Sequence, residues 1–170
     1  MRQRAILGRL PGTVFGVFDA ARDAAVLSVL TAFGGECRSL FAGEEGRKLA
    51  AFAPYLVELP ASGMLLRVVI EEGWGKSWGI FASGDCSFDE ARTHLRSLLL
   101  AKNAKGEQFY FRYYDPRVLR EFLPACRLDD LPPFYGPLQC FAMEDANPRN
   151  LLLFQRQRRE PESIPVGAKK

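Results

Sequence analysis

Two arginines and an aspartate in one short stretch are the side chains best suited to chemistry. Arg112 and Arg117 stand on either side of Asp115. A guanidinium carries a permanent charge and binds a carboxylate through two parallel hydrogen bonds. In one interpretation, Arg112 bridges to Asp115 or to loop carbonyls and fixes a corner of the fold. In the other, Arg112 and Arg117 bind a carboxylate or backbone group of a partner protein, and the sequence leaves both open.

Other groups with chemical potential are isolated from one another. His94 is the sole histidine, and because it lies beside an apolar helical stripe we predict that it packs at a helix–sheet junction. Residues 73–77 (GWGKS) contain the Gly-Lys-Ser of a phosphate-binding loop, but Ile70 stands where that motif needs a glycine. The aspartates fall at predicted turns and helix starts, where capping explains them. We therefore predict no catalytic residues, no cofactor and a protein that is not an enzyme.

The four cysteines give no sign of a metal site or a disulfide framework. Cys37, Cys86, Cys126 and Cys140 are far apart and include no Cys-x-x-Cys pair. This spacing predicts a metal-free, reduced protein in the cytoplasm. The sequence has no run of the roughly 18 apolar residues that a membrane span needs. Its first 12 residues lack the apolar core of a signal peptide, so we predict no membrane partner.

The composition is that of one globular domain. The chain has 170 residues, of which 48% are hydrophobic and 25% are charged, and these proportions are ordinary for a domain with a substantial core. Its net charge is +3. The basic residues are scattered along the chain and form no run, which argues against a nucleic-acid partner.

The elements that position the two arginines can be read from the surrounding residues. Residues 108–114 are rich in aromatic side chains, which favour a half-buried strand. Asp115 offers a carboxylate to the free amides of a following helix, and Pro116 suits the first helical position. Apolar residues then repeat at helical spacing until Pro124, where we expect the helix to end.

Strands and helices alternate through the rest of the chain. We predict strands at residues 14–18, 37–41, 54–59, 77–83, 138–143 and 151–154. Helices are predicted after residue 20, over residues 62–72, where a strand would also fit, and from a capping box made by Ser87 and Glu90. This pattern predicts an α/β fold, with a mixed, mostly buried β-sheet and helices packed on it in a single compact domain.

The two ends of the chain are expected to lie outside this domain. Residues 1–13 form an N-terminal arm, and residues 14–155 form the domain itself. Residues 156–170 are charged, contain proline and show no periodicity, so we expect a disordered tail.

Five sequence blocks in a fixed order carry a resemblance to a known family. They are VFGVFDAARD (14–23), SLFAG (39–43), APYLVEL (53–59), WG (78–79) with HLRSLL (94–99), and FRYYDPRVL (111–119). Together they resemble the pattern of a bacterial family of type VI secretion adaptors, also called effector chaperones. Members are understood to bind a toxic effector and deliver it to the spike protein of the secretion machine. The resemblance implies a non-catalytic adaptor whose partners are a secreted effector protein and the spike protein.

Such an adaptor would need apolar and aromatic anchors surrounded by a polar rim. Residues 132–137 bend sharply and present Phe134 and Tyr135 where a short chain has least core to cover them. We therefore predict Phe134 and Tyr135, together with Arg112 and Arg117, as partner-binding residues. Two alternatives stay open: a small hydrolase or transferase with a site built from Asp and Arg residues, and an interaction module unconnected with secretion.

Overall fold

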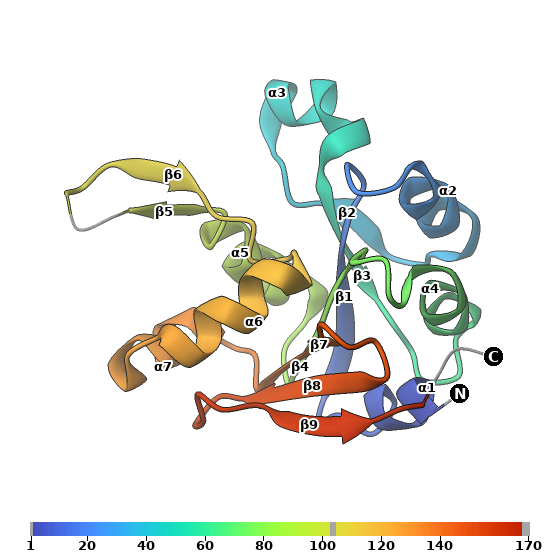
Figure 1. Cartoon of the computed structure of the whole chain (residues 1–170). Coiled ribbons are helices and arrows are strands. Elements are labelled where there is room, and N and C mark those ends of the chain that lie inside the picture. Colours follow the sequence, from blue (N-terminus) through green and yellow to red (C-terminus); the bar gives the residue numbers. More distant parts are fainter. Residues whose placement is uncertain (1, 103–104, 168–170) are drawn as a thin grey trace.

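The computed structural model of the protein describes residues 2–102 and 105–167, and a seven-stranded sheet forms its centre (Figure 1). The spatial order of the strands is β2 (Cys37–Ser39), β3 (Pro54–Glu58), β1 (Thr13–Asp19), β4 (Gly79–Gly84), β7 (Cys140–Glu144), β8 (Asn150–Gln155) and β9 (Glu162–Pro165). A separate two-stranded hairpin pairs β5 (Leu100–Lys102) with β6 (Gln108–Tyr110).

Every ladder of the main sheet in the described residues is antiparallel, whereas the alternation of strands and helices led us to expect both directions. The reason is that strands joined by a helix are not neighbours. The chain runs from β1 through α2 (Ala24–Phe33) to β2 in the same direction, but β3 lies between them. It then runs from β3 through α4 (Met64–Gly73) to β4, with β1 inserted between those two strands.

Helices cover both faces of the sheet (Figure 1). One face packs against α1 (Arg2–Leu7), α2 and α4, and the other against α5 (Phe88–Ser97), α6 (Pro116–Ala125) and α7 (Leu131–Tyr135). Alternate residues of β1 serve the two layers, because Phe15 and Val17 join one hydrophobic cluster and Val14 and Phe18 join the other. A sheet buried on both faces explains the continuous apolar runs in the sequence, and the predicted α/β fold in a single compact domain is confirmed.

Several local predictions are confirmed by the structure. Residues 64–73 are helical, which resolves the ambiguous segment in favour of a helix. Ser87 and Glu90 form the predicted capping box at the start of α5. Asp115 caps α6 and Pro116 occupies its first turn, and the helix ends one residue after Pro124. None of the helices in the described part of the chain is long and apolar enough to cross a membrane.

Three predictions about element extent were wrong. The aromatic strand predicted at 108–114 stops at Tyr110, because the chain turns there and sends Tyr113 and Tyr114 into the core beneath α6. The expected arm at the N-terminus is the packed helix α1, whose Leu7 is fully buried. The expected disordered tail contains β9, which pairs with β8 and places Val166 in the core.

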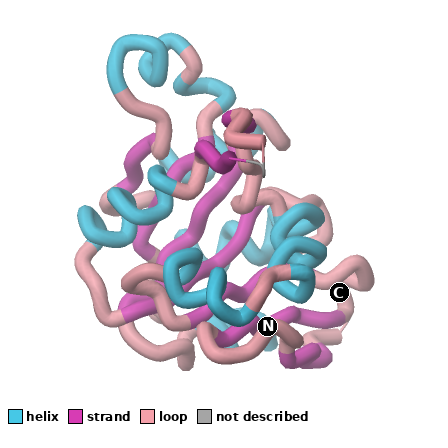
Figure 2. Tube along the Cα trace, turned by 90° about the vertical axis from the view of Figure 1, so that its left-hand side faces the viewer, coloured by secondary structure: helices cyan, strands magenta, loops and turns pink. Residues whose placement is uncertain are grey.

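Two short segments extend beyond the end of the sheet. One contains α3 (Gly43–Lys48) and a first 3-10 turn, η1 (Ala50–Phe52), and the other is the β5–β6 hairpin. Figures 1 and 2 both show α3 projecting past the sheet, and Figure 1 shows the hairpin projecting from the side that carries α5. A second 3-10 turn, η2 (Leu128–Asp130), connects α6 with α7.

Candidate functional site

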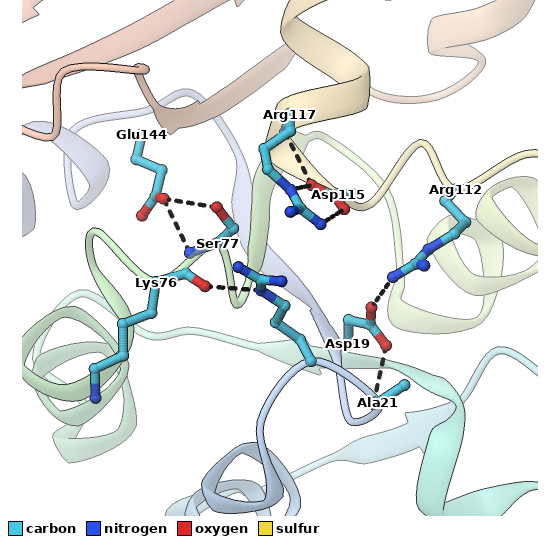
Figure 3. Close-up of polar contacts among 9 residues, drawn as sticks. Asp19, Ala21, Lys76, Ser77, Arg112, Asp115, Arg117 and Glu144 are labelled. Carbon is cyan, nitrogen blue, oxygen red and sulfur yellow. Dashed lines mark hydrogen bonds and ion pairs between the residues drawn. The ribbon is translucent and has the colours of Figure 1, made fainter.

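The charged corner predicted from the sequence exists, and Asp115 is its centre. The Asp115 carboxylate accepts a hydrogen bond of 3.0 Å from the backbone N–H of Arg117, which is the helix cap. The Arg117 guanidinium binds the same carboxylate through Nε at 2.9 Å and Nη2 at 2.6 Å (Figure 3). Burial alone would raise the pKa of Asp115, but these bonds from Arg117 hold it below its ordinary value. Arg117 is therefore engaged with its own helix start.

Arg112 does not bridge to Asp115, as one interpretation of the sequence had it. Its Nη2 donates at 2.6 Å to Asp19, a buried residue at the end of β1 that also accepts from the N–H of Ala21 at 3.0 Å (Figure 3). The Arg112 guanidinium lies 5.9 Å from the centre of the Tyr114 ring. This ion pair ties the loop before α6 to the first strand across 93 residues of sequence.

The GWGKS segment holds an anion after all, but the anion is a side chain of the protein itself. Glu144 at the end of β7 accepts hydrogen bonds from Gly75 N at 2.5 Å, Ser77 N at 2.9 Å and Ser77 Oγ at 3.1 Å. Ser77 adopts a positive φ of 57°, which lets the loop turn its amides toward one carboxylate. Burial raises the pKa of Glu144 despite these bonds.

Together these contacts place three buried carboxylates at one end of the sheet, each with donors around it (Figure 3). The pKa values of Asp115 and Glu144 move in opposite directions, which is the division that acid–base chemistry uses. The cavity lined by Glu144 and Trp74 measures about 10 Å³, the space of a single water molecule. The contacts of the cluster are architectural: Arg112 and Asp19 join the loop before α6 to β1, and Glu144 joins the end of β7 to the 73–77 loop.

Phe134 and Tyr135 are core residues, which corrects their prediction as surface anchors. Phe134 is 8% exposed and Tyr135 is fully buried. Both rings pack on Phe141 of β7, with centroid distances of 5.5 and 5.0 Å. The proline-rich bend forms the helix α7 and turns both rings toward the sheet. His94 makes a hydrogen bond between two helices and not at the predicted helix–sheet junction, since its Nε2 lies 2.8 Å from the carbonyl oxygen of Phe134 and joins α5 to α7.

The sequence analysis missed an open apolar groove between the two projecting segments. Its volume is about 520 Å³. The lining residues are Leu40, Phe41, Ala42, Gly46, Leu49, Arg96, Leu99, Leu100 and Tyr110. We call this feature the arm groove, because the α3 segment forms one wall and the β5–β6 hairpin forms the other. Two blocks quoted above, SLFAG and HLRSLL, supply residues to its lining, but nothing in the sequence relates one block to the other, so no sequence signal located the groove.

The hairpin wall of the arm groove is only partly covered, by contacts of Tyr110 with Phe41 and Tyr114. Leu100 and Tyr110 are paired across the ladder and share a face, and they are 60% and 40% exposed. Phe109, on the opposite face, is 47% exposed. Leu49 on the α3 wall is also half exposed. Exposed apolar side chains gathered around one hollow mark a surface for another molecule.

Arginines lie beside the groove without carboxylate partners. Arg96 Nε donates to the carbonyl oxygen of Leu40 at 3.1 Å, and Arg92 donates twice to that of Ser39, at 3.2 and 2.8 Å. Neither is in an ion pair within the described part of the chain. Burial lowers the pKa of Arg92, the charges of Arg96 and Arg38 lower it further, and the charge of Asp89 raises it. This side of the groove therefore carries an excess of positive charge.

One comparison with known proteins places the chain in a family. The family model described as Domain of unknown function (DUF4123) matches residues 14–132. No curated protein and no solved structure matches the chain. The matched segment runs from β1 into α7, and β7, β8 and β9 complete the same sheet beyond it. Because the match covers well over half of its length, the chain belongs to the DUF4123 family.

Proposed function

We propose that this protein is a non-catalytic adaptor in the bacterial cytoplasm, which binds a type VI secretion effector and helps to load it onto the spike protein. The observation that carries the proposal is the arm groove, with exposed apolar side chains on two projecting segments. The resemblance of five sequence blocks to the adaptor family supports the secretion context.

The physical demands of an adaptor agree with this surface. Binding another protein draws most of its energy from a few apolar or aromatic anchors that become fully covered, with polar groups at the rim. Leu100 and Tyr110 supply apolar area, and Arg96 supplies a charge at the edge. The charged corner serves the same task indirectly, because it fixes α6 and the loop that leads from the hairpin into it.

Co-expression with neighbouring gene products tests the proposal. If genes for a spike protein and a toxin lie beside its own, the protein would be co-expressed with both, and complexes would be isolated through a tag on the toxin. We expect the protein to co-purify with the toxin, and a deletion strain to stop exporting it while still assembling a working secretion machine. Normal export from the deletion strain, or absence of any complex, would contradict the adaptor function.

The hydrolase or transferase alternative has one observation in its favour, the opposite pKa shifts of Asp115 and Glu144. An enzyme built on this pair would lose activity in Glu144→Gln. The adaptor proposal expects the same variant to support normal effector export, because Glu144 is not among the residues that line the groove and accepts hydrogen bonds from Gly75 and Ser77. Export by this variant therefore separates the two functions.

A further inference from the structure

We propose that the arm groove binds a segment of a partner polypeptide that inserts two or three apolar side chains and carries acidic residues on its flank. This inference rests on the proposed adaptor function and names the chemistry of the segment that the adaptor holds. Four features of the described residues lead to it: a partly covered hairpin, a fixed floor, arginines without ion pairs and the like charge of a second copy.

The hairpin is the first feature. Within the described residues, β5 and β6 pair only with each other. An isolated two-stranded ribbon is marginal in water unless something packs on one of its faces. The face with Leu100 and Tyr110 turns toward the groove, where the two side chains remain 60% and 40% exposed. A partner segment lying there would bury both side chains and supply the missing layer.

The second feature is the rigid floor. Leu40 and Leu99 line the groove and belong to the main hydrophobic cluster, with 1% and 6% exposure. Phe41 and Tyr110, from opposite walls, meet edge to face with ring centroids 5.8 Å apart. The two walls are therefore already in contact before any partner arrives. A preformed site loses less conformational freedom on binding, which favours affinity.

The third feature is the positive charge of the arginines beside the groove, which favours acidic residues next to the apolar side chains of the bound segment. Arg92 and Arg96 each donate to backbone carbonyls, and neither forms an ion pair within the described residues, although the charge of Asp89 acts on Arg92. Arg38 differs, because Glu36 and Asp89 pair with it at 2.6 and 2.7 Å. A carboxylate beside Arg96 would add a charge-assisted hydrogen bond at the edge of an apolar site.

The same charges argue against other occupants. A symmetric dimer through the groove would set the same patch against itself, and two basic rims would then face each other. Proteins bind single-stranded nucleic acid by stacking its bases on open aromatic side chains, whereas leucines make up much of this lining. An acidic, apolar polypeptide segment fits both the lining and the charge.

Peptide display on the purified full chain tests this directly. A random peptide library would be selected on the immobilised wild-type protein, and enriched peptides would be titrated by fluorescence anisotropy. We expect enriched sequences to combine two or three large apolar residues with Asp or Glu nearby. Leu100→Asp and Leu49→Asp should each weaken binding at least tenfold, and Arg96→Gln should weaken it severalfold at low salt and less at high salt.

Met64→Asp is the matched control, because Met64 is also about half exposed but begins α4 on the other face of the sheet. It should bind the peptides like wild type, and thermal melts should show that all variants are folded. Equal binding by Leu100→Asp, Leu49→Asp and wild type would overturn the proposal, as would a library that yields no enriched peptide. A dimer that dissociates in Leu100→Asp would give the groove to a second copy and also overturn it.

The same variants separate this inference from the adaptor function. If the effector binds wild type and Leu100→Asp equally, the groove is the wrong surface and the adaptor function stands. If acidic apolar peptides bind through the groove but neither effector nor spike co-purifies, the groove stands and the secretion role fails.

Discussion

The charged corner and the arm groove both contain arginines, but they use them in opposite ways. At the corner, the guanidinium groups of Arg112 and Arg117 each bind a buried carboxylate of the same chain. At the groove, Arg92 and Arg96 bind carbonyl oxygens and keep their charge. A charge that the fold neutralises serves architecture, whereas an uncompensated charge at an apolar rim is available to a partner. Position in a sequence motif does not distinguish the two cases.

Aromatic side chains show the same contrast. Phe134 and Tyr135 belong to α7 and pack against Phe141 of the sheet, whereas Tyr110 lies on the projecting hairpin and stays 40% exposed beside Phe41 and Tyr114. The residue types are alike, so the difference lies in how completely the rest of the fold covers them. If the comparison is right, substitutions of the buried α7 rings should lower stability, and substitutions on the hairpin should weaken partner binding.

The largest expected effect comes from removing the Tyr135 ring. Tyr135→Ala leaves a cavity in the core and should lower the free energy of unfolding by about 3–5 kcal/mol, measured by chemical denaturation. Tyr135→Phe is the control. The Tyr135 hydroxyl is buried and has no hydrogen-bond partner within the described residues, so Phe should keep or slightly raise stability. A small loss of unfolding free energy in Tyr135→Ala would contradict the core position of this ring.

A smaller loss is expected at the charged corner. Asp115→Ala removes the α6 cap and the carboxylate that Arg117 binds, and should destabilise the protein by about 0.5–2 kcal/mol. The Arg117 side chain is 45% exposed, so water can solvate its charge when the carboxylate is gone, which limits the loss of stability. Asp115→Asn retains a capping oxygen and should lose less. An unchanged unfolding midpoint in Asp115→Ala would make the carboxylate a candidate for function instead of architecture.

The fold was predictable where local pattern decides it. Apolar runs indicated strands covered on both faces, and Ser87, Glu90 and Asp115 signalled helix starts through contacts two or three residues away. Strand neighbours are a different matter, because periodicity carries no information about which strand pairs with which. The position of β3 between β1 and β2 therefore could not be predicted from the sequence. The strand β9 was missed because four residues in a charged segment gain order from the ladder with β8, not from their own propensity.

The site followed the same rule. The cap of Asp115 on the N–H of Arg117 spans two residues and was predicted, whereas the pair between Arg112 and Asp19 spans 93 and was not. Phe134 was misplaced because the prolines around it suggested an exposed bend, and α7 forms there instead. The arm groove joins residues from segments about fifty to seventy positions apart, and only the fold reveals that their exposed faces meet.

A still smaller stability effect is expected on the hairpin. Leu100→Asp should change the free energy of unfolding by no more than about 0.5 kcal/mol, because Leu100 is 60% exposed and contributes little buried area. Denaturation of this variant beside Tyr135→Ala gives the sharpest test of the contrast between the two regions. A loss of several kcal/mol in Leu100→Asp would show that the hairpin packs as core, and the contrast would fail.

The smallest effect on stability is expected from pH, through the titration of Glu144 in its contact with the 73–77 loop. Because burial raises the pKa of Glu144 in the folded protein, the folded state holds a proton that the unfolded chain has already lost. The contribution of Glu144 to stability therefore grows as pH falls from neutral through the raised pKa, and it levels off below the ordinary value of 4.5. Asp115 has the opposite sign, since its lowered pKa gives stability that is lost at acid pH.

Glu144→Gln removes this titration and keeps one oxygen to accept from the loop amides. The melting temperature of the variant relative to wild type should be higher at pH 7 than at pH 5, because wild type alone gains stability as Glu144 takes up its proton. Glu121→Gln, at an exposed position on α6, corrects for the change in net charge. A difference between Glu144→Gln and wild type that stays constant from pH 7 down past the ordinary value of 4.5 would contradict a raised pKa. The hydrogen bonds from Gly75 and Ser77 would then offset the effect of burial on the pKa of Glu144.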